Sequence, residues 1–207
     1  INAIDKGHFK DQILPIELKT RKGTTLFERD EHPRADVTLE GLAKLRAAFK
    51  KEGGSVTAGN ASGINDGAAA VVLMEKEAAQ KAGLKPMARL VSYGLAGVDP
   101  KIMGIGPVPA VRNALKRAGL RIEDMDVIES NEAFAVQALA VSCDLKLDPQ
   151  KTNPNGGAVG LGHPIGATGA ILTVKAMYEL QRTGGKYALV TMCIGGGQGI
   201  AAVFERM

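Results

Sequence analysis

Short apolar runs alternate with amphipathic stretches from about residue 56 to the end of the chain. A continuous apolar run at residues 68–74 is followed by a short amphipathic stretch that stops at Gly83, which predicts a buried strand and then a helix. Further strands are expected at residues 89–93 and 126–129 and over the segments YALVTMC and IAAVF. Strands that alternate with helices are typical of an α/β sheet covered by helices on both faces.

Three helices are predicted between these later strands. One carries an apolar stripe ahead of Gly119, one covers the segment NEAFAVQALAVSC, and one follows a glycine-rich segment with a stripe through Ile171, Val174 and Met177. The stripe ahead of Gly119 consists of Val111, Ala114, Leu115 and Ala118.

The first fifty residues are polar and irregular, and they resemble an elaborated loop region. One amphipathic stretch interrupts them, in which apolar or long side chains recur at helical spacing after a possible cap at Thr38. Its positions are Leu39, Leu42, Arg46 and Phe49.

The composition indicates a globular protein with an unusual amount of glycine. Glycine makes up 26 of 207 residues, above the usual share of about 7%, so the backbone is expected to approach other groups closely. The net charge of +4 is spread along the chain, which favours anionic ligands without indicating nucleic acid. No apolar run reaches the length of about 18 residues that a membrane span needs, so no membrane partner is expected.

The two cysteines, Cys143 and Cys193, occur in no CxxC pair, so neither a disulfide framework nor a zinc or other metal site is indicated. A reducing, cytoplasmic location is therefore expected. The chain begins at Ile1 without a methionine, which suggests that an upstream portion is missing.

Two loops carry candidate polar chemistry. Asn131 and Glu132 follow a predicted strand, where they can cap a helix, or the Asn131 amide can anchor a water molecule or an oxyanion. His163 lies between Gly162 and Pro164 in a glycine-rich segment that matches neither the dinucleotide nor the P-loop spacing. It is either a structural histidine at a tight turn or an imidazole that approaches a substrate.

A third loop places Cys193 at the end of an apolar strand, before the glycines at 195–197. Most free cysteines are small buried hydrophobes, and Cys143 in its apolar helix is interpreted in that way. Cys193 becomes a useful base or nucleophile if a nearby imidazole, such as His163, lowers its pKa. The backbone N–H groups at 195–197 can then bind an oxyanion.

At these residues the sequence resembles the thiolases, enzymes such as acetyl-CoA acetyltransferases and β-ketothiolases. The matching strings are GNASGINDGAAA at 59–70, GIGPVPA at 104–110, NEAFA at 131–135, NPNGGAVGLGHPIGATGA at 153–170 and CIGGGQGIA at 193–201. The resemblance implies a layered αβαβα fold, of which this chain is the C-terminal half of a subunit. It further implies a loop-domain segment at 1–63, the final strand and helix of the N-terminal domain at 64–84, and the C-terminal domain at 85–207.

The resemblance also implies a role for each matching residue in an acyltransferase that acts on coenzyme A (CoA) thioesters. His163 would activate a nucleophilic cysteine, Cys193 would move the α-proton, Asn131 would hold a water molecule of one oxyanion hole, and the Gly195 N–H would contribute to another. Arg34 would lie near the nucleotide of CoA and Ser62 near its pantetheine arm. The acyl and pantetheine pocket would be lined by Met103, Ala133 and Phe134.

The resemblance implies no cofactor beyond CoA itself as substrate or product, and a homodimeric or homotetrameric assembly. One departure concerns the acylated cysteine of the family, which lies in an N-terminal half that this sequence does not contain. That half is therefore an expected partner, and the chain alone is expected to lack turnover. The alternative is a thiolase-like module that binds acyl-CoA or lipid without catalysis.

Overall fold

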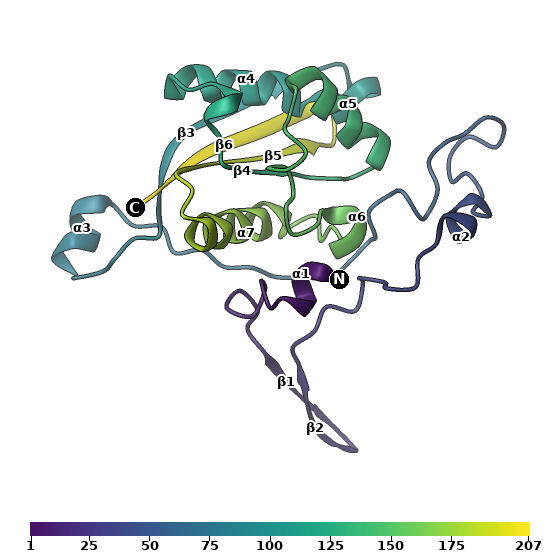
Figure 1. The fold of residues 1–207 in the computed structure, drawn as a ribbon, viewed down its shortest axis with the longest axis horizontal. Coiled ribbons are helices and arrows are strands. Elements are labelled where there is room, and N and C mark those ends of the chain that lie inside the picture. Colours follow the sequence, from purple (N-terminus) through teal and green to yellow (C-terminus); the bar gives the residue numbers. More distant parts are fainter.

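A computed structural model describes all residues from Ile1 to Met207. Residues 88–206 form three layers, in which helices cover both faces of a four-stranded mixed sheet (Figure 1). The strands are β3 (Ala88–Gly97), β4 (Val127–Ser130), β5 (Tyr187–Ile194) and β6 (Gln198–Arg206), in the spatial order β3-β6-β5-β4. β4 and β5 are parallel, whereas β6 is antiparallel to both of its neighbours. The predicted alternation of strands and helices in this part of the chain is confirmed.

The helices lie as the apolar stripes require. α4 (Pro107–Ala118) and α5 (Ala135–Leu145) cover one face of the sheet, and α7 (Thr168–Thr183) covers the other (Figure 1). α4 starts with a proline at its first position and ends at Gly119 in the left-handed conformation, with φ of 67°. Short helical turns join the layers, namely η1 (Pro100–Ile105), η2 (Ile122–Asp124) and α6 (Ala158–Leu161).

Two apolar clusters, one on each face of the sheet, form the core. The larger contains Val111, Ala114 and Leu115 of the predicted α4 stripe, packed with Ile128, Leu189 and Val203 from the strands. The smaller joins Leu172, Ala176 and Leu180 of α7 to Val127, Ala188 and Val190. Every residue of β4 is buried, so polar groups on this strand need partners inside the protein.

The strand expected at residues 68–74 is not formed, and this prediction is wrong for the chain as it stands. The segment is extended but has no neighbouring strand, so its backbone groups have no ladder to join. Val72 and Leu73 are 88% and 83% exposed. The helix expected after it is present as α3 (Lys76–Lys81).

Two other expectations need correction. Cys143 is exposed, because α5 buries the face that carries Gln137, Val141 and Leu145, and position 143 lies about 200° around the helix from position 141. The amphipathic stretch after Thr38 forms only α2 (Leu39–Ala43), although the Thr38 side chain does accept the Gly41 N–H as expected. Its predicted apolar positions Leu39 and Phe49 are 81% and 75% exposed, since no layer covers them.

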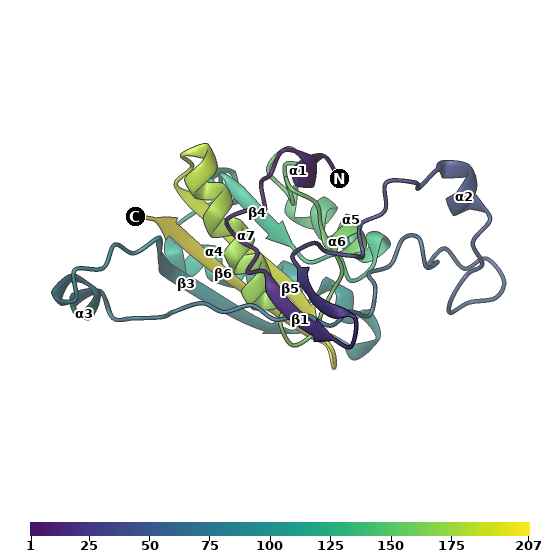
Figure 2. The same cartoon turned by 90° about the horizontal axis from the view of Figure 1, so that it is seen from below.

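Residues 1–81 lie outside the three layers (Figures 1 and 2). They include α1 (Asn2–Asp5) and an antiparallel hairpin of β1 (Ile16–Thr20) and β2 (Gly23–Phe27), all of whose residues are exposed. The β1–β2 hairpin, α2 and α3 project from the body. Other parts of this range lie against the body, including His8, which bonds to Asn155, and the segment 61–65. No helix of the protein has both the length and the apolar character needed to cross a bilayer.

A buried ion pair joins β4 to α7. Lys175 Nζ lies 2.7 Å from Glu129 Oε2 and also donates to the Gly156 carbonyl over 2.7 Å, and the two side chains are 6% and 0% exposed. Burial raises the pKa of Glu129, against the opposing effect of Lys175, and Glu129 Oε1 has no partner. The pair therefore fixes α7 and the segment around Gly156 to the buried strand.

We expect Lys175→Met to lower the free energy of unfolding by about 3–5 kcal/mol, because it leaves a carboxylate buried without its cation. The double variant Glu129→Gln, Lys175→Met removes both charges and is expected to recover part of that loss. Urea unfolding of the two variants, with the exposed Lys116→Met as a control, measures the difference. A double variant no more stable than the single one would contradict the account.

Candidate active site

The carboxyl ends of two parallel strands bring Asn131 and Cys193 to one edge of the sheet. Asn131 follows β4 directly, and its backbone N–H continues the ladder by donating to the Thr191 carbonyl of β5 over 2.9 Å. Cys193 lies two residues further along β5 and is half-buried. Open α/β sheets expose functional groups at such strand ends.

The His163 ring lies in the loop between α6 and α7, and its hydrogen bonds define its tautomer. Thr168 Oγ1 donates its only proton to the Pro164 carbonyl over 2.8 Å, so it accepts from His163 Nδ1 at 2.7 Å. Nε2 then carries a lone pair, which accepts from Asn131 Nδ2 over 3.3 Å. Burial lowers the pKa of His163, which favours this neutral ring. The ring is therefore a base whose free electron pair faces Asn131.

Asn131 does not cap a helix, and its side-chain oxygen is left unpaired in the interior. α5 begins only at Ala135, after extended backbone at Phe134, and no side chain caps it, so the capping interpretation of Asn131 is wrong. Asn131 is 1% exposed, and its Oδ1 has no hydrogen-bond partner in the chain. An unpaired acceptor in the interior is costly, so this oxygen is suited to bind a donor that a ligand or water brings.

The adjacent Glu132 has a structural role. Its two carboxylate oxygens accept from Asn153 Nδ2 at 3.0 Å and from the Val159 N–H at 3.1 Å. Asn153 in turn bonds to both backbone groups of Ser130. Glu132 thus holds the glycine-rich segment against the end of β4.

Cys193 lies at the same edge of the sheet but makes no hydrogen bond with His163, whose ring nitrogens are occupied by Asn131 and Thr168. Burial raises the pKa of the Cys193 thiol. The structure thus differs from the expected imidazole-lowered thiol pKa, because desolvation disfavours the thiolate and no cation faces it. Cys193 is accordingly a thiol near neutral pH.

The glycine loop after Cys193 presents free backbone donors. Gly195 and Gly196 are exposed, and the N–H of neither enters a hydrogen bond of the chain. The backbone after the loop packs tightly against the backbone before α4. A Cβ on Gly199 would lie only 2.0 Å from the Gly106 carbonyl oxygen. The glycine at position 199 therefore permits close contact between two backbone segments, and this contact positions the loop that carries the exposed Gly195 and Gly196.

Three of the predicted substrate contacts come together at the start of α5. The Ser62 N–H donates to the Ala133 carbonyl over 3.0 Å, and Ala61 pairs with Phe134 as an antiparallel bridge. Ala133 is buried, while Ser62 and Phe134 are half-buried. Chain segments about seventy residues apart thus form one surface beside Asn131.

The two other predicted contacts come from other parts of the chain. Met103 is half-buried in η1, where the Gln137 side chain donates to the neighbouring Gly104 carbonyl over 3.0 Å. Arg34 is exposed on an arm of the chain, and its guanidinium pairs with Asp36 at 2.8 Å. Both of its side-chain hydrogen bonds go to Asp36, which is not a predicted site residue.

Two residues of the site were not predicted. Thr168 fixes the His163 tautomer, and Asn65 Oδ1 accepts the backbone N–H of His163 over 3.1 Å. Thr168 begins α7 only five residues after His163, so its closeness to the ring could have been inferred from the sequence. Asn65 is 98 residues from its partner, and nothing in the residue pattern indicates that contact.

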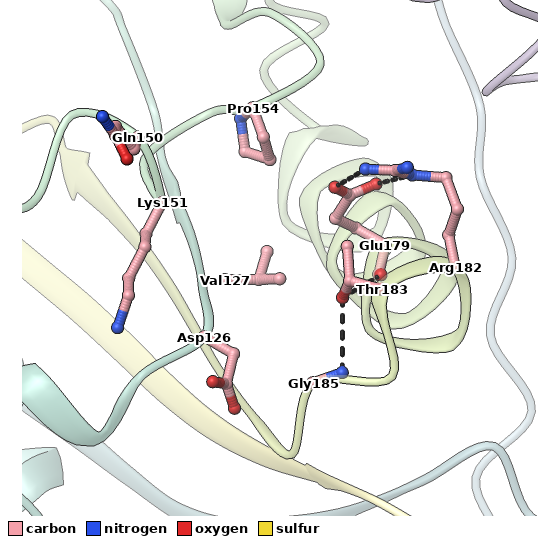
Figure 3. Close-up of a pocket in the computed structure, with 9 residues that line it drawn as sticks. All are labelled: Asp126, Val127, Gln150, Lys151, Pro154, Glu179, Arg182, Thr183 and Gly185. Carbon is pink, nitrogen blue, oxygen red and sulfur yellow. Dashed lines mark hydrogen bonds and ion pairs between the residues drawn. The ribbon is translucent and has the colours of Figure 1, made fainter.

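A polar pocket at the opposite end of β4 offers no competing site (Figure 3). Its charged groups are already paired: Glu179 with Arg182 at 2.6 Å, Asp126 with two backbone N–H groups, and Lys151 with the Met125 carbonyl at 2.8 Å. No cluster of three or more His, Cys, Asp or Glu side chains could hold a metal ion.

The sequence matches two family models. The one described as "Thiolase, C-terminal domain" covers residues 84–206, and the one described as "Thiolase, N-terminal domain" covers residues 1–77. The Beta-ketothiolase BktB of Cupriavidus necator is 66% identical over 205 residues, which are 99% of this chain and 52% of that protein. The chain thus spans about half the length of the relatives that it matches.

Solved structures agree with these matches. The Bacillus anthracis acetyl-CoA acetyltransferase is 55% identical with a TM-score of 0.97, over 100% of this chain and 52% of that one. A human mitochondrial 3-ketoacyl-CoA thiolase in complex with CoA is 48% identical with a TM-score of 0.90, over 100% of this chain and 51% of that one. The predicted α/β fold of thiolase type is therefore confirmed for the part that this chain covers.

We expect Asn131→Asp to raise the pKa of His163, because it places a carboxylate beside Nε2 and stabilises the imidazolium. In the unaltered protein, His163 is expected to titrate below the usual value of about 6.5 and to carry its proton on Nδ1. NMR of the ring nitrogens measures both properties. An unchanged His163 titration in Asn131→Asp would show that the two side chains are not in contact.

Proposed function

The chain belongs to the thiolase family, and from this membership and the geometry of its site we propose that it supplies the base and oxyanion groups of a CoA-thioester acyltransferase. The full-length protein would join two acetyl-CoA molecules into acetoacetyl-CoA, or cleave 3-oxoacyl-CoA in the reverse direction. The observation that carries the proposal is the neutral His163 ring, whose Nε2 lone pair faces a buried Asn131 with an unpaired Oδ1.

In the cleavage direction, a cysteine thiol outside this chain attacks the 3-oxo carbon, and its proton passes to His163 Nε2. The carbon–carbon bond between the 2 and 3 positions then breaks, and the electron pair leaves on an enolate of acetyl-CoA. Cys193 protonates that enolate, a role supported by the raised pKa of its thiol. The acyl group remains on the attacking cysteine until a second CoA, whose thiol proton passes to the Cys193 thiolate, attacks the acyl carbon. The bond to the cysteine then breaks, and the cysteine takes back its proton from His163.

The negative charge that develops during these steps resides first on the 3-oxo oxygen and then on the thioester oxygen of the enolate, and both oxygens need preorganised donors. The free N–H groups at Gly195 and Gly196 support one such site, and a donor held at Asn131 Oδ1 supports the other. Glycine backbone is suited to this role, because no side chain stands between the N–H and the substrate.

We assign CoA binding to the surface beside Asn131 that Ser62, Ala133 and Phe134 form, with Met103 lining the acyl end and Arg34 reaching the nucleotide. The net charge of +4 supports an anionic ligand of this kind. CoA enters as substrate and product, and no other cofactor is proposed. The human mitochondrial 3-ketoacyl-CoA thiolase that was solved in complex with CoA supports the ligand class.

We propose that a further half of the subunit packs on this chain. Residues 68–74 are extended, apolar and exposed, as expected of a strand whose sheet lies outside the chain. The α7 face of the sheet is also open beyond α7, where Tyr93 and Leu95 of β3 are 53% and 56% exposed. On this basis residues 1–63 are a loop-domain segment, 64–84 complete the N-terminal domain, and 85–207 are the C-terminal domain.

The finer features of the assembly are proposals as well. The exposed hairpin of β1 and β2 carries apolar side chains that support self-association into a homodimer or homotetramer. These side chains are Ile16, Leu18, Leu26 and Phe27. The free cysteines support a cytoplasmic location.

We expect His163→Ala to lower kcat for thiolysis of acetoacetyl-CoA by about 10²–10⁴-fold in the full-length protein, because the base is lost. Cys193→Ala is expected to act in the same direction, while the exposed Lys116→Ala leaves the rate unchanged. Loss of substrate absorbance measures the rates. Full activity in His163→Ala would refute the assignment, and CoA binding without turnover in the unaltered protein would support a binding module instead.

We expect the double substitution Val72→Asp, Leu73→Asp to prevent residues 68–74 from joining a partner sheet, because it buries two charges. The chain and the first half of the subunit are produced separately, and their association is measured by calorimetry. Leu39→Asp, which changes an equally exposed leucine on α2, is the control. Equal affinity for both variants would contradict the proposed docking of this strand.

A further inference from the structure

Asn65 contacts the backbone of the catalytic loop from a distant part of the chain. Its Oδ1 accepts the His163 N–H over 3.1 Å, and the preceding residue, Ile64, pairs with His163 as a parallel bridge. No other side chain accepts from the His163 N–H. The bonds of the His163 ring fix its rotation, while Asn65 and the bridge hold its backbone from outside the loop.

The orientation of the Asn65 amide is determined at both ends. A backbone N–H can only donate, so Oδ1 must face His163. At the other end, Asn65 Nδ2 lies 3.4 Å from His32 Nδ1, and His32 Nε2 lies 3.3 Å from the Val159 carbonyl, which can only accept. His32 therefore donates from Nε2 and accepts at Nδ1. The hydrogen bonds from His163 through Asn65 and His32 to Val159 are thus consistent with a single orientation of the Asn65 amide.

The close approach of Asn65 requires the glycine that precedes His163. A Cβ on Gly162 would lie 2.6 Å from Asn65 Oδ1, and Gly162 has φ of 100°, which side chains rarely adopt. The glycine thus serves two purposes, since it permits the turn and leaves room for the amide. The half-buried Asn65 fills that room.

We propose that Asn65 is a positioning residue for His163, an inference that rests on the proposed function of that ring. Asn65 sets the backbone at 163 so that Nε2 reaches the reacting thiol and Asn131 together. Ser62, three residues before Asn65, belongs to the proposed CoA-binding surface. The segment 61–65 therefore connects the proposed CoA-binding surface to His163, the residue proposed to accept the thiol proton.

Two substitutions separate this role from general packing. Asn65→Leu keeps the size of the side chain but removes the acceptor, whereas Asn65→Asp keeps an acceptor for the His163 N–H. Asn113 is the matched control, since its amide lies on the exposed side of α4 and bonds to the Leu95 carbonyl over 3.0 Å. Asn113→Leu and Asn113→Asp carry the same changes away from the site.

We expect Asn65→Leu to lower kcat for thiolysis by about 10–100-fold in the full-length protein with KM changed less than about threefold, because a misplaced base slows the chemistry more than binding. Asn65→Asp is expected to recover at least about tenfold of that loss. Both control variants keep the unaltered rate. If Asn65→Leu does not fold, Asn65→Ser replaces it, because its hydroxyl is too short to reach the His163 N–H.

Hydrogen exchange gives a readout that does not depend on activity. The His163 amide is expected to exchange at least about tenfold faster in Asn65→Leu than in the unaltered protein, and not in Asn113→Leu. Unchanged exchange, or unchanged kcat in an active protein, would overturn the positioning role. An unaltered protein without thiolysis would refute the proposed function, and the exchange rates would still decide whether Asn65 holds the loop.

Discussion

The backbone of residues 153–168 has little regular secondary structure, yet it runs between buried layers where its polar groups need partners. Side chains from three directions supply them. Lys175 on α7 binds the Gly156 carbonyl, Glu132 after β4 binds the Val159 N–H, and Asn65 binds the His163 N–H. Because each anchor comes from a different element, the loop cannot shift at one point without breaking a bond at another. The position of His163 follows from this requirement.

Glycine makes that arrangement possible at the points of closest approach. At Gly162 the backbone turns while the Asn65 side chain packs directly against it. At Gly199 the start of β6 packs against the backbone that precedes α4. The first contact places the His163 loop, and the second places the loop that follows Cys193. The high glycine content noted in the sequence therefore has a specific cause, since the site is assembled from backbones that touch.

How far the sequence predicts this structure depends on where the partners of each residue lie. The α4 stripe and the strands from β3 onward follow from local periodicity, because their neighbours are within the chain. The run at 68–74 has the pattern of a buried strand but no sheet to join, and Cys143 lies in an apolar helix on the face that the core does not use. The candidate residues His163, Cys193 and Asn131 were found through motifs. Asn65 was not, because its role depends on a tertiary contact that no local spacing encodes.

The protonation states of the site have a common physical origin. Burial lowers the pKa of His163 and raises the pKa of Cys193, so desolvation favours the uncharged form of both groups. A site with a neutral base and a protonated thiol carries no net charge on these groups before reaction, and its strongest fixed dipoles are the N–H groups and amides around it. Both residues are still only half-buried in this chain. Any segment that covers them removes more water, which moves both pKa values further in the same directions and strengthens every dipole that faces the thioester.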